Sequence, residues 1–316
     1  MKSANNSPKL GRRVFLTVAG AAPVAGLLAQ APPPRPITNA SVPGDPAAPK
    51  EQVGTAPAWA PFDEPLTFAR KDLELRVAPF PLAQVRLLPS VFLNAQESNR
   101  GLLRRYDADR LLHTFRLNAG LPSSAKALGG WEKPDGELRG HFMGHYISGL
   151  SLMYASTGDP EMKKKADYIV AELGKCQERL GGGYLSAFPL SQFDRLKART
   201  RVWAPFYTYH KILAGMIDAH VHCGSDTALR IAQGMADWTD QWTAALSTDQ
   251  MQMVLDEEYG GMNEALYNLA ALTSTPRYAT VGDRFTKKRF FNPLALRRDQ
   301  LRGLHTNTHI PQVMGA

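Results

Sequence analysis

Three similar turns divide the helical part of this chain, and they restrict the folds that it can adopt. The turns lie at 158–160 (GDP), 224–226 (GSD) and 274–276 (STP), and each follows an apolar helical pattern. Glycine commonly follows the last residue of a helix, whereas proline and short polar residues commonly begin one. The repetition therefore predicts a series of helix hairpins joined by longer loops.

The spacing of apolar residues places helices on both sides of these turns. Tyr146, Ile147, Leu150, Met153 and Tyr154 recur at the spacing of one helical face. Further helices are predicted over residues 161–179, 207–223, 227–246 and 262–273, with another after Pro276. Alternation of apolar and polar residues predicts short strands at 73–77 and 85–88.

Stacked helix hairpins form either an open solenoid or a closed α/α toroid. Long loops that contain glycine and aromatic residues recur at one end of the hairpins and favour the toroid. The helical region from Val91 to Ala316 is too short for six hairpins of this size. We therefore expect a mainly α fold, an incomplete (α/α)6 toroid whose unpaired apolar faces would favour aggregation or a partner.

The first 31 residues have the features of a twin-arginine export signal. The motif RRVFL begins at Arg12, a weakly apolar stretch follows, and AQA at 29–31 supplies a cleavage site. The stretch is too short and too rich in glycine and alanine to span a membrane. We expect a periplasmic or extracellular protein with no membrane span after cleavage. A Pro/Ala-rich linker and leading segment is predicted over 32–72, before a partial catalytic barrel over 73–316.

The positive charge of the chain does not indicate a nucleic-acid partner. The formal net charge is +8, but four of the positive residues and no acidic residue lie within 1–31, which leaves +4 for the remainder. No long basic run remains there, so nucleic-acid binding is not expected. Cys176 and Cys223 lie in separate helical patterns, and they are either buried thiols or one disulfide.

Two histidines open the first candidate site motif, GHFMGHY at 140–146. His141 and His145 are four residues apart, on one helical face if the helix has begun. This spacing can bind zinc, but Phe142 stands where a zinc peptidase has its general-base glutamate. The interpretations left open are binding of sugar hydroxyls and a structural role.

Aromatic residues and a histidine open the next helix in the motif VWAPFYTYHK at 202–211. Trp203 and Tyr207 offer aromatic faces on which a sugar ring can stack, and His210 can donate or accept a hydrogen bond. Core packing is the alternative for these residues, most clearly for Tyr209.

Two further motifs combine carboxylates, amides and histidine: EYGGMNE at 258–264 and LHTNTHIP at 304–311. Glycoside hydrolysis generally uses two carboxyl groups, and Glu258, just before two glycines, is the best placed. Glu264 is either functional or a favourable charge in the first turn of a helix. Asn263 and His305 complete the set of candidate binding residues.

The order and the residues of these motifs resemble those of the β-L-arabinofuranosidase-like proteins of glycoside hydrolase family 127, a family once described as a domain of unknown function. The resemblance begins near FPLAQVRL at 80–87, continues through DRLLHTFR at 109–116 and GGWE at 129–132, and includes all four motifs. It covers 73–316 and matches the N-terminal part of the family's catalytic domain.

The resemblance implies an (α/α)6-barrel exo-glycosidase that acts on plant-derived arabinofuranosides with retention of configuration. Members use a zinc-bound cysteine thiolate as nucleophile and a glutamate as acid/base. His210 and His305 match positions that contact the sugar, and His141 and His145 match the pocket region. The family's catalytic and zinc-binding residues are expected beyond Ala316, so this chain is expected to hold no cofactor and to be inactive as a truncated form.

Two alternatives to an incomplete glycoside hydrolase remain open from the residues. One is a carbohydrate-binding pseudoenzyme that binds sugar without hydrolysing it. The other is a toroidal lyase or epimerase that would use Glu258, Tyr207 and His210 as acid and base.

Overall fold

The computed structural model describes residues 79–316, and within this range the chain is mainly helical, as predicted. The described residues contain twelve α-helices and no β-strand. The predicted signal, the linker and the strand at 73–77 lie outside the described residues. In the described range no helix is long and apolar enough to cross a membrane.

The strand predicted at 85–88 is wrong. This segment is irregular and follows a single 3-10 turn, Leu82–Gln84. The guanidinium group of Arg86 donates hydrogen bonds to the carbonyls of Val85 (2.9 Å) and Ser156 (3.0 Å). Contacts of one long side chain, including one with the end of a helix, therefore hold the segment, and residues 79–316 contain no strand with which it could form a ladder.

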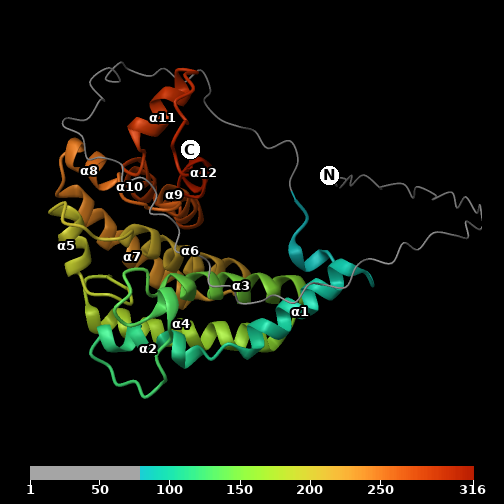
Figure 1. Cartoon of the computed structure of the whole chain (residues 1–316). Helices are drawn as coiled ribbons and strands as arrows, with labels where there is room; N and C mark the ends of the chain where they lie inside the picture. The colour runs from blue at the N-terminus through green and yellow to red at the C-terminus, as the bar shows by residue number, and fades with distance from the viewer. Residues whose placement is uncertain (1–78) are drawn as a thin grey trace, which may run out of the picture. The chain divides into compact units, whose positions relative to one another are not determined.

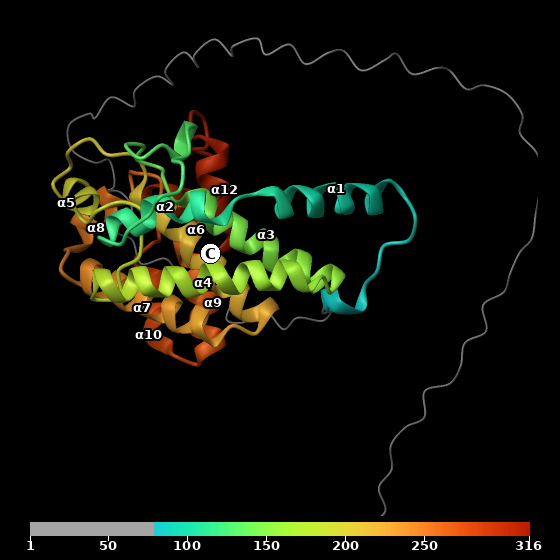
Figure 2. The ribbon, with the colours of Figure 1, turned by 90° about the horizontal axis from the view of Figure 1, so that it is seen from below.

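Six helices form three hairpins that stack in two layers (Figures 1 and 2). In one layer α3 packs against α6 and α6 against α9, whereas in the other α4 packs against α7 and α7 against α10. The first layer, here called the inner helices, contains α3 (His141–Thr157), α6 (Pro205–Cys223) and α9 (Met262–Thr273). The second layer, the outer helices, contains α4 (Pro160–Leu180), α7 (Asp226–Ala244) and α10 (Pro276–Asp283). This arrangement matches the predicted series of helix hairpins.

The three predicted turns connect the two layers. Gly158 and Gly224 adopt left-handed conformations (φ 73° and 68°) that end α3 and α6, and Ser274 does the same (φ 52°) after α9. Glycine has no Cβ atom to oppose this conformation. The outer helices α4 and α7 then begin with side-chain caps from Asp159 and Ser225.

Two glycines allow α3 and α6 to pack with their backbones in contact. A Cβ atom on Gly144 would lie 2.0 Å from the carbonyl oxygen of Lys211, and one on Gly215 would lie 2.7 Å from the carbonyl oxygen of Gly144. No larger residue fits at either position without separating the helices. This close approach brings the N-terminal residues of α3 and α6 within reach of each other.

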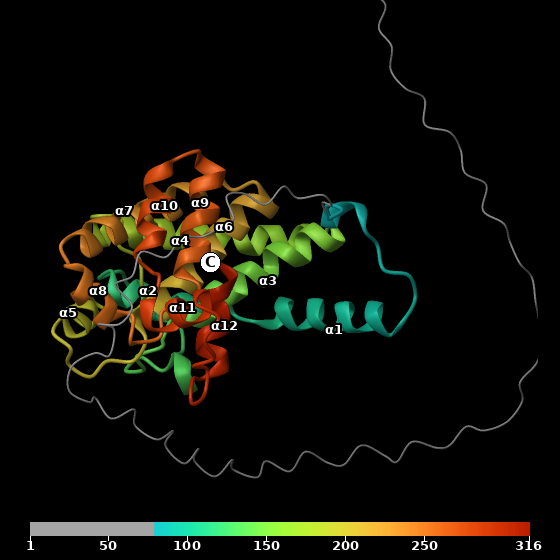
Figure 3. The ribbon, with the colours of Figure 1, turned by 90° about the horizontal axis from the view of Figure 1, so that it is seen from above.

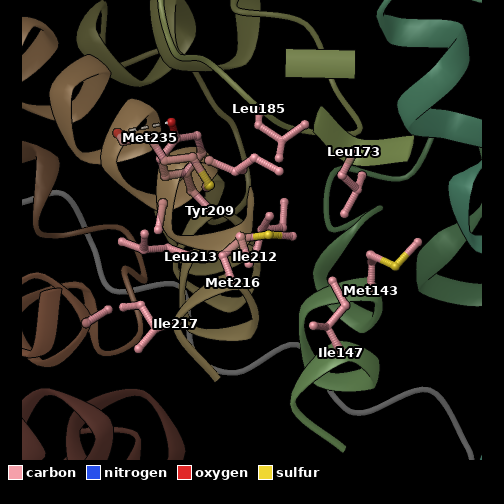
Figure 4. Packing of buried hydrophobic residues seen from close by; sticks show 14 of the residues in the cluster. Met143, Ile147, Leu173, Leu185, Tyr209, Ile212, Leu213, Met216, Ile217 and Met235 are labelled. Carbon is pink, nitrogen blue, oxygen red and sulfur yellow. Dashed lines mark hydrogen bonds between the residues drawn. The ribbon is translucent and has the colours of Figure 1, made fainter. Parts of the chain in front are cut away.

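Fully buried apolar side chains fill the space around this helix pair (Figure 4). Met143 and Ile147 project from α3, and Ile212, Leu213 and Met216 project from α6. Loss of a buried Leu, Ile or Met side chain typically costs about 2–5 kcal/mol. The packing therefore fixes the inner helices firmly and leaves their remaining faces to carry polar groups.

Shorter helices surround the hairpins. At the N-terminal side, α1 buries only Leu103 and extends beyond the hairpins (Figure 3). At the C-terminal side, α12 packs against α9 and exposes Ile310, Val313 and Met314. The helices outside the hairpins are α1 (Val91–Arg105), α2 (Ala108–Asn118), α5 (Ser191–Lys197), α8 (Thr248–Val254), α11 (Lys288–Ala295) and α12 (Thr306–Met314).

Candidate carbohydrate-binding site

The N-terminal ends of the three inner helices meet, because each helix is followed by an antiparallel outer helix that returns the chain to the same end. At the start of α3, the ring of His141 lies 6.2 Å from that of Tyr207 at the start of α6. The backbone of Gly261, which precedes α9, contacts His210 of α6. Three motifs separated in sequence therefore form one site.

Glu132 closes the N-terminal end of α3, whose preceding residue, Gly140, has no side chain to cap it. The Glu132 carboxylate accepts hydrogen bonds from the backbone N–H groups of Gly140 (2.6 Å) and Phe142 (3.0 Å). One of its oxygens also lies 2.7 Å from Nδ1 of His141. A carboxylate at this position satisfies unpaired amides and interacts favourably with the helix dipole.

The buried ring of His141 has its tautomer set by its neighbours. Its Nδ1 atom lies 2.8 Å from the carbonyl oxygen of Leu138 as well as near Glu132. Both neighbours only accept hydrogen bonds, so Nδ1 carries a proton, and in the neutral form of this ring Nε2 is the acceptor. The ring of His145 stands edge-on to that of His141 at 6.1 Å.

His210 has the opposite tautomer. The backbone N–H of Gly261 donates a hydrogen bond to Nδ1 of His210 at 3.2 Å, so this nitrogen is an acceptor and the proton resides on Nε2. Gly260 and Gly261 pack directly against the ring, since a Cβ atom on Gly260 would lie 2.6 Å from Nδ1. The two glycines of the third motif are thus required by the close approach to His210.

A cavity of about 230 Å³ lies between α3, α6 and α9. His145 and His210, two of the predicted site residues, line it, as does Glu264. Its wall also contains Lys211 and Asp218, which were not among the predicted site residues. The other lining residues are Ser148, Ala214, Ile217, Ala265 and Asn268.

Lys211 is the half-buried cation of this wall. Its Nζ atom lies over the ring of Tyr207, 4.8 Å from the centroid. Burial lowers the pKa of Lys211, while the charges of Glu258 and Glu264 oppose this shift. The ammonium group therefore contacts an aromatic face and is favoured by the charges of two carboxylates.

Both cavity histidines are neutral at pH 7. Burial, followed by the nearby charge of Lys211, lowers the pKa of His210 to about 3. The same two causes lower the pKa of His145 to about 4, although this residue is more exposed than His210. Neutral imidazoles favour hydroxyl groups over anions as ligands.

Two half-buried carboxyl groups have raised pKa values, and one of them, Asp218, lines the cavity. Burial raises the pKa of Asp218, with a hydrogen bond from Ser148 opposing the shift. Burial also raises the pKa of Glu257, and a backbone hydrogen bond from Ala204 opposes it. The predicted acid Glu258 is half-buried. Burial of Tyr207, followed by the charge of Glu258, raises the pKa of Tyr207.

Trp203 lies two residues before the start of α6 and is 46% exposed. Its backbone N–H donates a hydrogen bond to the carboxylate of Glu137 at 2.9 Å, and Glu137 also pairs with Arg195. Tyr209, by contrast, is fully buried in the core, which is the alternative considered for it from the sequence.

Only two of the eight predicted binding residues line this cavity, and the other six do not: His141, Trp203, Tyr207, Glu258, Asn263 and His305. Two of these six, Asn263 and His305, contact residues of α12 instead. Asn263 is buried, and its side-chain amide donates a hydrogen bond to the carbonyl of Gln312 at 2.9 Å, which ties α9 to α12. His305 precedes α12, is exposed, and has its Nδ1 atom 2.8 Å from Oγ1 of Thr308. In the described residues neither side chain lines the cavity with His145 and His210.

The described residues do not fit a zinc–thiolate centre. Over 79–316, no group of three or more His, Cys, Asp and Glu residues is arranged to hold a metal ion. Cys176 and Cys223 are free and buried, on α4 and α6. Burial raises the pKa of the Cys176 thiol to about 11, so it is protonated and a poor ligand or nucleophile.

Comparison with known families gives one clear match. Residues 84–316 match the catalytic domain of the GH127 β-L-arabinofuranosidases. A search among curated proteins finds no match.

Among solved structures, the chain is similar to Ara127N-Se, a GH127 β-L-arabinofuranosidase from Geobacillus stearothermophilus T6. The identity is 15% and the TM-score 0.43, over 73% of this chain and 36% of that one. The chain thus spans about a third of the length of that enzyme. Because the family match extends over most of the sequence, this chain belongs to the family of the GH127 β-L-arabinofuranosidase catalytic domain.

Proposed function

We propose that the cavity between α3, α6 and α9 binds the terminal sugar of plant-derived β-L-arabinofuranosides, as part of a glycoside hydrolase. The observation that carries this proposal is the pair of neutral histidines with Lys211 and Glu264 in one small cavity. At about 230 Å³ the cavity is smaller than the roughly 300–1,000 Å³ pockets of drug-sized ligands, and its size suits a single sugar ring.

The hydrogen-bonding groups of the site suit a ligand with several hydroxyls. In the cavity wall, His210 offers a donor at Nε2 and Lys211 offers further donors. Beside it, outside the cavity wall, the neutral ring of His141 would offer an acceptor at Nε2. A hydroxyl group both donates and accepts, so it can satisfy either histidine. The family match favours a hydrolase over the lyase or epimerase that the acid–base residues alone would allow.

We expect the chain by itself to bind sugar without hydrolysing it, and to hold no stoichiometric zinc. Both of its thiols are buried, outside the cavity wall, with raised pKa values. A protonated and inaccessible thiol cannot act as a nucleophile. Turnover of an arabinofuranoside by the purified chain, or one tightly held zinc per chain, would contradict this expectation.

Calorimetric titration with methyl β-L-arabinofuranoside tests the binding proposal. We expect saturable binding to the wild-type chain and a loss of about tenfold or more in the His210→Gln variant, because the fixed imidazole donor is replaced by a flexible amide that does not keep its position. His113→Gln is the matched control, since His113 is a half-buried histidine of α2 that contacts Ser123. Equal affinity of wild type and His210→Gln would refute the site, and no binding by wild type would refute the function.

We further propose that residues 1–31 direct export by the twin-arginine route. The supporting observation is the RRVFL motif before a weakly apolar stretch and a small-residue cleavage site. Fused ahead of a folded reporter, residues 1–31 should place the reporter in the periplasm, and replacement of Arg12 and Arg13 by lysine should retain it in the cytoplasm. Export that is insensitive to the arginine pair would indicate another route.

A further inference from the structure

Trp131 is a large aromatic residue that the fold leaves open to solvent beside the candidate site. Its side chain is 66% exposed, in the short 3-10 turn Gly130–Glu132 that lies between α2 and α3. Its ring centroid lies 5.9 Å from that of buried His141, with 57° between the ring planes. The indole therefore lies between the buried ring of His141 and the solvent.

The backbone that carries Trp131 is fixed at the next residue. Both carboxylate oxygens of Glu132 are engaged by the start of α3, one by the N–H of Gly140 and the other by the N–H of Phe142. Later in the same loop, Arg139 donates hydrogen bonds to the carbonyls of Gly136 (2.8 Å) and Ala187 (2.9 Å). The loop that carries the indole is thus anchored by these hydrogen bonds. The indole itself is exposed, so it contributes little to the packing of the core.

A second exposed indole, that of Trp203, also lies on a backbone that a hydrogen bond holds in place. Trp203 is 46% exposed, and its backbone is held by Glu137 of the same loop. Tyr207, four residues further on, lies beside His141, which is also the neighbour of Trp131. Rigid aromatic groups bind a flat apolar surface with little loss of conformational freedom. Two indoles on anchored backbones therefore suit a ligand that is longer than one sugar ring.

We propose that Trp131 is a further carbohydrate-contact residue, which stacks on the second sugar of an arabinofuranosyl oligosaccharide, and that Glu132 is its positioning residue. This inference rests on the proposed function, because it assumes that the terminal sugar occupies the cavity. It adds to that function a preference for a chain of at least two sugars over a simple glycoside.

The test compares methyl β-L-arabinofuranoside with a β-L-arabinofuranosyl disaccharide by calorimetry on the full chain. We expect Trp131→Ala to weaken disaccharide binding about five- to tenfold and to leave the methyl glycoside unaffected, as for loss of one aromatic stacking contact. Phe92→Ala is the matched control, because Phe92 is an aromatic residue of α1 with 71% exposure. It should change neither affinity.

Unchanged disaccharide affinity in Trp131→Ala would overturn the inference while the proposed function stands. If the wild-type chain binds neither ligand, the proposed function fails and this inference fails with it. If Trp131→Ala weakens both ligands equally, Trp131 acts on the terminal sugar or on folding, and the second-sugar contact is wrong.

Glu132→Gln tests the positioning role. The amide keeps one acceptor oxygen but cannot accept from both backbone N–H groups, and it also alters the contact with His141. We expect weaker binding of both ligands and loss of the disaccharide-induced shift of the Trp131 indole N–H resonance. Asp107→Asn is the control, because Asp107 accepts from two backbone N–H groups at the start of α2. Wild-type affinities and an unchanged indole shift in Glu132→Gln would overturn the positioning role.

Discussion

The backbone N–H of Gly261 donates a hydrogen bond to Nδ1 of His210 across the start of α6 and α9. This single contact joins two motifs that lie about fifty residues apart in the sequence, at a separation of 3.2 Å. It leaves the proton of the neutral imidazole on Nε2, and it explains why the third motif contains two glycines.

Acidification should destabilise the fold through His210. The pKa of His210 is lowered by burial to about 3, below the value near 6.5 of an unfolded histidine. The unfolded state therefore binds more protons between these values, and this contribution is fully present above pH 6.5 and is lost as the pH falls toward 3. From pH 7 to pH 5 we expect a loss on the order of 2 kcal/mol from this group.

Denaturant unfolding of wild type and His210→Gln at both pH values measures this effect. The glutamine variant does not titrate here, so its loss of stability over the same interval should be smaller by that amount. Parallel pH dependence of the two proteins would show that His210 is protonated as readily in the folded as in the unfolded state.

Gly260→Ala should destabilise the protein more than Gly158→Ala does. Both glycines have positive φ angles, 60° and 73°, so each substitution carries the backbone cost of about 1–2 kcal/mol. Only at Gly260 would the new Cβ atom also lie 2.6 Å from His210, whereas nothing lies within 4 Å of a Cβ atom on Gly158. Thermal unfolding of both variants gives the comparison, and equal losses would mean that the ring moves away without cost.

Gly144→Ala should separate α3 from α6, because its Cβ atom would lie 2.0 Å from the carbonyl oxygen of Lys211. We expect a loss of about 3 kcal/mol or more, or failure to fold, as for a severe overpacking. Gly149→Ala in the same helix is the control. Its Cβ atom would make only ordinary contact with Leu103 at 3.4 Å, so helix propensity should stabilise it by about 0.5–1 kcal/mol. Chemical denaturation should rank the two variants on opposite sides of wild type.

Lys211→Met should raise the pKa of His145. Removal of the ammonium group removes one of the charges that oppose protonation of this ring, while burial, the larger cause, remains. Titration of the His145 ring signals by NMR should therefore move the pKa from about 4 part of the way toward 6.5. Lys175→Met on the outer helix α4 should have no effect, and an unmoved His145 titration in Lys211→Met would show that the ammonium does not act on it.

Much of the fold could be predicted from the sequence because its signals are local. The turns after α3, α6 and α9 follow from Gly158, Gly224 and the Ser274 segment, and the helix from Met262 to Thr273 has the predicted ends. Helical period and chain reversal depend on residues within a few positions of each other. The strand predicted at 85–88 failed because alternation alone supplies no partner, and Arg86 holds this segment instead.

The candidate site was predicted in part. His145 and His210 line the cavity together as the helix-end motifs suggested, but Asn263 turns toward α12, and His305 stays outside the cavity. Lys211 ends the motif at 202–211 but was not named as a binding residue, and Asp218 was missed because it lies outside the four motifs; both share a helical face with Ala214. Their spacing along α6 is the signal that could have found them.

The sequence by itself determined the helices, the turns between them and the residues that open each inner helix, since these depend on local backbone preferences. Only the tertiary structure decided which polar groups face one another. The close approach of α3 and α6 at Gly144 sets the distance between His141 and Tyr207, and the approach of Gly261 sets the tautomer of His210. Contacts of this kind depend on the angle and separation of packed helices, which no single segment of the chain specifies.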